Sequence, residues 1–66
     1  MHLNNLRTGK YYSLRNHGET FEFQVVEILS REDFRLKDIH TMEYYDMSDL
    51  VRYGRGEDYL LDELRR

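Results

Sequence analysis

The segment Asp49–Tyr59, DLVRYGRGEDY, contains the residue types most suited to binding chemistry in this chain. Two glycines flank an arginine, and a second arginine and a tyrosine stand just before them. Arginine contacts phosphate groups and tyrosine stacks on bases, so the loop is a candidate nucleic-acid site, and two tyrosines elsewhere could serve as further stacking platforms. The candidate binding residues are therefore Tyr11, Tyr45, Arg52, Tyr53 and Arg55.

The same loop has a simpler interpretation as a tight bend. Its Gly-Arg-Gly lacks the GK[ST] ending of a phosphate-binding loop, and acidic residues lie on both sides of it, at positions 46, 49, 57 and 58. Gly54 is expected to end a helical turn as its C′ residue, and Gly56 to ease entry into the last strand. We favour this structural interpretation of the two glycines.

Neither a metal site nor catalysis is predicted. His40 and Glu43 stand three residues apart with Asp38 nearby, while His2 and His17 lie elsewhere. On a strand or turn that spacing points two ligands to opposite faces. No nucleophile elbow or paired-carboxylate motif marks a reactive group, so we expect no enzyme and no cofactor.

The length and composition of the chain limit the fold, the location and the partners that it can have. The chain has 66 residues, enough for one domain with a small core, and no cysteine, which fits a reducing cytoplasm. Its amino terminus lacks the apolar run of a signal peptide, and no membrane partner is expected. Residues 1–37 carry six Lys/Arg against five Asp/Glu, whereas residues 38–66 carry four against eight. A net charge of −3 makes nucleic-acid binding the less favoured alternative.

The segments that carry the candidate binding residues are predicted to be mainly strands. The sequence has no alanine but has six Tyr and three Phe, which favours strands over helices. Alternation predicts strands near 10–15 and 20–29, with Tyr12 and Leu14 facing inward in the first. In the second strand the apolar positions change parity after Val25, which predicts a β-bulge near Val25 and Val26 and a sharp bend there.

The second half of the chain predicts two more strands and a short helix. Phe34 and Leu36 are expected to face inward in a strand near 33–38, as are Met42 and Tyr44 in a strand near 42–47, which leaves Tyr45 outside. Ser48 is expected to be the N-cap of a helical turn over 48–53. Residues 58–64 are read as a fifth strand; the alternative is a four-stranded sheet with a C-terminal helix, since the leucines also fit helical spacing.

This order of elements resembles the SH3-like barrel family, which includes Tudor-like barrels, over roughly residues 9–64. Residues 37–59 are also similar to small uncharacterised bacterial single-domain proteins. The resemblance implies a five-stranded barrel with a one-turn helix before the last strand, and binding of peptides, proteins or nucleic acid with no reaction. The absence of tryptophan argues against recognition of proline-rich peptides. An aromatic cage for a methylated side chain is a remoter expectation.

Two functions follow as hypotheses. The first is a non-enzymatic protein-interaction module whose partner is unknown, with self-association possible through open strand edges. The alternative is binding of RNA or single-stranded DNA through an Arg/Tyr surface that includes Arg52, Tyr53 and Arg55.

Overall fold

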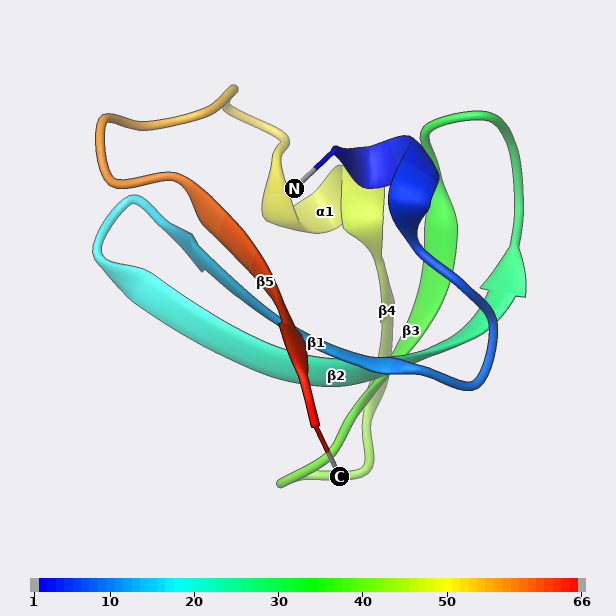
Figure 1. The fold of residues 1–66 in the computed structure, drawn as a ribbon. Coiled ribbons are helices and arrows are strands. Elements are labelled where there is room, and N and C mark those ends of the chain that lie inside the picture. The colour runs from blue at the N-terminus through cyan, green and yellow to red at the C-terminus, as the bar shows by residue number, and fades with distance from the viewer. Residues whose placement is uncertain (1, 66) are drawn as a thin grey trace.

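The computed structural model describes residues 2–65, which form one antiparallel sheet of five strands with two short helical segments (Figure 1). The elements in chain order are the 3-10 helix η1 (Leu3–Asn5), β1 (Tyr11–Asn16), β2 (Glu19–Ile28), β3 (Phe34–Asp38), β4 (Tyr44–Asp46), α1 (Met47–Leu50) and β5 (Leu60–Leu64). The strand order across the sheet is β4-β3-β2-β1-β5. The mainly-β fold with a short helix before the last strand is confirmed, and the alternative of a C-terminal helix is wrong.

The β1–β2 hairpin follows the alternation of its sequence. Tyr12 and Leu14 are buried, as predicted, and pair with Phe23 and Phe21 on β2. Both residues of the turn, His17 and Gly18, have positive φ angles of 51° and 78°. A two-residue hairpin turn of type I′ requires this combination, and glycine adopts it without strain.

The predicted bulge in β2 is confirmed. The register with β3 shifts between Val25 and Glu27, so Val26 is the additional residue. Because of this bulge, β2 pairs with β1 through residues 19–24 and with β3 through residues 23–28, and Figure 1 shows the strand curving between its two neighbours. Ile28, beyond the bulge, is 54% exposed at the end of the strand and adds little to the core.

The predicted facing of β4 is wrong. Tyr45 lies opposite Leu36, which is fully buried, and directly opposed residues of an antiparallel pair share a face. Tyr45 therefore points toward the core, whereas Met42 and Tyr44 are each 61% exposed. The reason is the connection before β4, in which Met42 has a φ of 65° and its N–H donates to the carbonyl of Asp38. Residues 42 and 43 therefore belong to the connection, although the sequence pattern assigns them to the strand.

The helix before β5 also begins earlier than predicted. Its N-cap is Asp46 rather than Ser48, and the Asp49 carboxylate accepts the backbone N–H of Asp46 at 3.1 Å. The helix ends at Leu50, and turn residues follow it. A single helical turn therefore lies between β4 and the loop that leads to β5.

The core lies on the concave side of the sheet, where η1 and α1 cover it (Figure 1). Its buried apolar residues are Leu3, Leu6, Tyr12, Leu14, Phe23, Val25, Phe34, Leu36, Met47 and Leu61. The molecule is compact, with extents of 28 × 25 × 20 Å. Within residues 2–65, no helix has the length and apolar character needed to cross a membrane.

Candidate functional site

The fold does not gather the five candidate binding residues at one place. Tyr11 lies on the outward face of the sheet, because its neighbour Tyr12 points into the core. Tyr45 packs against the core, Arg52 and Tyr53 follow α1, and Arg55 lies further along the loop to β5. Tyr11, Tyr45, Tyr53 and Arg55 each line a different hollow, and Arg52 lies beside Tyr53.

Tyr45 anchors the sheet rather than presenting a stacking surface. Its hydroxyl donates to Oδ2 of Asp38 at 2.8 Å, and its ring meets Phe21 edge-on at 6.1 Å between centroids. Burial raises the pKa of Tyr45, and the hydrogen bond to the Asp38 carboxylate raises it further. The phenol is thus held in its neutral form, as a hydrogen-bond donor.

The arginines of the loop are both engaged. Nη2 of Arg52 lies 3.2 Å from Oδ1 of Asp49, and the guanidinium of Arg55 sits 4.7 Å from the centroid of the Tyr59 ring, a cation–π contact. The Asp46 N–H and then Arg52 lower the pKa of Asp49. Hydrogen bonding to Asp49 and then to Tyr53 raises the pKa of Arg52. Tyr53 itself is 83% exposed, the highest value among the large exposed hydrophobic side chains of the described residues.

A hollow of about 390 Å³ beside Tyr53 is the first candidate site, and we call it the α1 groove. Phe21, Leu50 and Tyr53 supply its apolar surface, and Glu19 and Asp49 its carboxylates. Asn16 and His17 complete the lining from the end of β1 and the turn that follows. The groove therefore runs between the β1–β2 hairpin and α1, two parts of the chain that are far apart in sequence.

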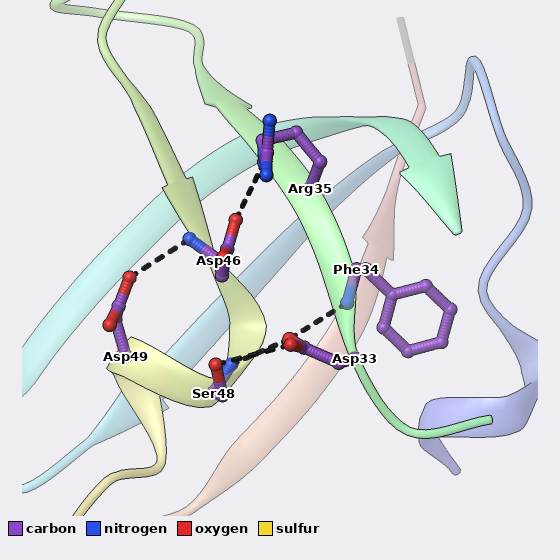
Figure 2. Close-up of polar contacts among 6 residues, drawn as sticks. All are labelled: Asp33, Phe34, Arg35, Asp46, Ser48 and Asp49. Carbon is purple, nitrogen blue, oxygen red and sulfur yellow. Dashed lines mark hydrogen bonds and ion pairs between the residues drawn. The ribbon is translucent and has the colours of Figure 1, made fainter. Parts of the chain in front are cut away.

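One carboxylate fixes α1 to the loop before β3. Asp33 accepts the backbone N–H and the hydroxyl of Ser48 at 3.0 and 3.3 Å, and also the N–H of Phe34 at 3.0 Å (Figure 2). A second link joins Arg35 of β3 to Asp46 at 2.7 Å. These contacts position the helix whose far end carries Leu50 and leads to Tyr53.

The opposite wall of the groove is fixed by Asn16, a buried polar residue. Its Nδ2 donates to the carbonyls of Leu50 and Gly54, both at 3.1 Å, and its Oδ1 accepts the N–H of Gly56 at 2.8 Å. Asp58 adds a second tie, because its carboxylate accepts the N–H groups of His17 and Gly18 at 2.9 and 2.8 Å. We call this set of contacts the hairpin latch.

The latch explains the Gly-Arg-Gly sequence. Gly54 has a φ of 84°, and its N–H donates to the carbonyl of Val51. It is therefore the end of a turn that follows α1, not the C′ residue of the helix as predicted. A Cβ on Gly56 would lie 2.9 Å from Nδ1 of His17, so the close approach of the hairpin favours glycine there.

Two further shallow hollows both include Tyr11 in their lining. One, of about 190 Å³, includes Lys37 and Met42; the other, of about 290 Å³, includes Lys10 and Arg65. None of these four residues is among the candidate binding residues predicted from the sequence, and Met42 and Tyr44 were expected to face inward. The sole signal available was the alternation of β1 and β3, which already placed Tyr11 and Lys37 outward.

The histidines do not form a metal centre. Nε2 of His40 contacts Oε1 of Glu22, and the backbone N–H of His40 donates to Asp38 at 2.8 Å. Within residues 2–65, no group of three or more His, Cys, Asp or Glu side chains is placed to hold a metal ion.

Comparisons of the chain with protein-family models, curated proteins and solved structures found no match.

Proposed function

We propose that the protein is a non-enzymatic binding module that holds a short extended segment of a partner protein in the α1 groove. The observation that carries the proposal is the exposure of Tyr53, 83%, at the edge of a groove lined by Phe21 and Leu50. Exposed aromatic side chains beside apolar hollows are typical of the energetic centres of protein interfaces. A rigid groove also loses little conformational entropy on binding, and the hairpin latch supplies that rigidity.

The chemistry of the groove favours a basic residue next to an apolar one in the partner. Glu19 provides a carboxylate in the groove that Tyr53 lines, and Asp49 provides a second one, which Arg52 already contacts at 3.2 Å. A carboxylate together with an aromatic ring attracts a lysine or arginine through charge and cation–π interactions. The net charge of −3 steers a basic segment toward the molecule. The absence of cysteine fits a cytoplasmic location for the module.

An SH3-like barrel is the fold that we infer for this module. Its support is the strand order β4-β3-β2-β1-β5, the bulge at Val26 and the helical turn between β4 and β5. Amide hydrogen exchange tests closure, because a closed barrel protects the outer amides of β5, whereas an open edge leaves them unprotected. Fast exchange along the outer side of β5 would contradict the barrel.

Binding is tested with two pools of labelled nonapeptides, one with a fixed central arginine flanked by apolar residues and one with a fixed central glutamate. Titration of the ¹⁵N-labelled protein with the arginine pool is expected to shift the amide resonances of Phe21, Leu50 and Tyr53. Tyr53→Ala should weaken binding about tenfold, as expected for a tyrosine at an interface centre.

The matched control is Tyr44→Ala, which removes another exposed tyrosine outside the α1 groove and should leave peptide affinity unchanged. Equal binding of the glutamate pool, or resonance shifts that avoid the groove, would contradict the proposal. Sedimentation of the free protein at the titration concentration separates peptide binding from self-association through the edge strands β4 and β5.

A further inference from the structure

One row of side chains crosses the whole outward face of the sheet. Tyr11 pairs with Leu64 on β5 and with Gln24 on β2, Gln24 pairs with Lys37 on β3, and Lys37 pairs with Tyr44 on β4. Directly opposed residues share a face, so these side chains lie side by side on the face away from the core. At about 4.8 Å between strands, the row spans roughly 19 Å.

Cations and tyrosine rings alternate around this row. Lys10 and Arg65 line one of the two hollows that include Tyr11, and Lys37 lines the other. Lys37 also lies over the ring of Tyr44, with Nζ 5.9 Å from its centroid. Of the ion pairs found within residues 2–65, none involves these three cations.

The acidic groups near the row are mostly engaged elsewhere. Asp38 accepts hydrogen bonds from the N–H groups of His40 and Thr41 and from the hydroxyl of Tyr45, and Glu22 is paired with His40. Glu63 is the carboxylate that lines the hollow with Lys10 and Arg65. Asp62 pairs with Ser13 and therefore shares the outward face with Tyr11 as a further carboxylate. The three cations Lys10, Lys37 and Arg65 outnumber the two carboxylates Asp62 and Glu63 beside the row, on a molecule whose net charge is −3.

We infer that this row of side chains, which we call the outer row, binds single-stranded nucleic acid. Phosphates would lie against Lys10, Lys37 and Arg65, and bases would stack on the exposed ring of Tyr44, which is 61% exposed, and beside Tyr11. Alternating cations and rings fit a phosphodiester chain better than an acidic peptide, because a peptide carboxylate offers charge without a flat surface to stack. The inference goes beyond the proposed function, since the outer row and the α1 groove share no residue.

Fluorescence anisotropy with labelled 12-mers of deoxythymidine and uridine, at about 20 mM salt, tests the inference. Lys10→Glu/Lys37→Glu is expected to weaken binding at least tenfold. Arg52→Glu/Arg55→Glu changes the net charge by the same amount but lies outside the outer row, and it should weaken binding less than threefold. The double change in the outer row should also lower the slope of log affinity against log salt by about 1.4, because each phosphate contact on a single strand contributes about 0.7.

The tyrosines provide a test that is independent of charge. Tyr44→Ala should weaken binding about tenfold, in the range measured for loss of one stacked base, whereas Tyr44→Phe keeps the ring and the affinity. Tyr53→Ala, in the α1 groove, should leave it unchanged. Circular dichroism establishes that each variant is folded.

Three results would overturn the inference: no binding at low salt, an equal loss from the Arg52/Arg55 variant, or equally effective competition by oligoglutamate of the same charge. Each of these leaves the peptide experiment unaffected, because that experiment depends on Tyr53 and not on Tyr44. The two proposals can therefore fail separately.

Discussion

Oδ1 of Asn16, at the end of β1, accepts the backbone N–H of Gly56 at 2.8 Å, across 40 positions of the chain. The same side chain donates to the carbonyls of Leu50 and Gly54. Asn16 is 2% exposed, so its buried amide relies on these three backbone groups for its hydrogen bonds. A single amide thus joins the β1–β2 hairpin to the end of α1 and to the glycine-containing loop.

Asn16→Ala is expected to lower the free energy of unfolding by about 2–3 kcal/mol, because it removes three hydrogen bonds made by a buried side chain. Urea denaturation monitored by circular dichroism measures the change. Asn5→Ala, at an exposed asparagine of η1, is the control and should cost less than about 0.5 kcal/mol. Equal effects of the two substitutions would show that the latch does not stabilise the fold.

Gly56→Ala is expected to destabilise the protein by about 1 kcal/mol, since its Cβ would crowd Nδ1 of His17 and displace that ring from the carbonyl of Gly54. The crowding should disappear in a His17→Gly background, where glycine also suits the positive φ at position 17. A double-mutant cycle measures this coupling. If the effects of the two substitutions on stability were additive, crowding between position 56 and His17 would not be the cause of the destabilisation.

Asp33→Ala is expected to cost about 1–2 kcal/mol, because the loss frees the N–H of Ser48 in the first turn of α1 (Figure 2). Asp33→Asn retains an acceptor and should recover about half of that loss. Glu32→Ala, at the exposed neighbouring residue, should be close to neutral. Thermal unfolding of the three variants provides the comparison.

Acid is expected to destabilise the fold through its hydrogen-bonded carboxylates. The Gly18 N–H, with that of His17, lowers the pKa of Asp58. For Asp38, burial opposes ionisation, but the N–H groups of Thr41 and His40 and the Tyr45 hydroxyl outweigh it and lower the pKa. Because an unfolded aspartate titrates near about 3.9, this stabilisation is present above that pH and is lost as the pH falls through the lower folded values.

The urea midpoint should therefore fall progressively below about pH 4. Asp58→Asn removes one titrating group, so its midpoint should be lower than that of the parent near neutral pH and should depend less on pH in the acid range. A variant with an unchanged acid dependence would assign the effect to other carboxylates.

The bulge in β2 predicts unequal costs for two aliphatic truncations. Leu36→Ala removes a fully buried side chain and is expected to cost about 2–5 kcal/mol. Ile28→Ala lies beyond the bulge, where the side chain is 54% exposed, and should cost less than about 1 kcal/mol. Chemical denaturation at 25 °C distinguishes them, and similar losses would mean that Ile28 belongs to the core.

Much of the fold follows from local pattern. The alternation in β1 identified Tyr12 and Leu14 as inward residues, and the change of parity in β2 located the bulge beside Val26. The pattern failed in β4, because two adjacent tyrosines fit either facing and the choice depends on how many residues the preceding turn consumes. A left-handed residue at Met42 made that turn longer than the pattern implied.

The candidate site was less predictable. Four of the five expected residues line different hollows, and the α1 groove depends on contacts between Asn16 or Asp58 and groups about 40 positions away. Such contacts leave no periodic signal in the chain. The outer row was equally hidden, because its members become neighbours only through the register of four strand pairs.

The sequence by itself determined the first three strands, the bend in β2 and the side of β1 that faces the core, because these depend on side-chain period within a few residues. The tertiary structure alone decided which tyrosines are exposed, why the loop glycines are needed, and which charged and aromatic residues meet. Those outcomes depend on strand register and on hydrogen bonds between distant segments, which form only when the sheet is assembled.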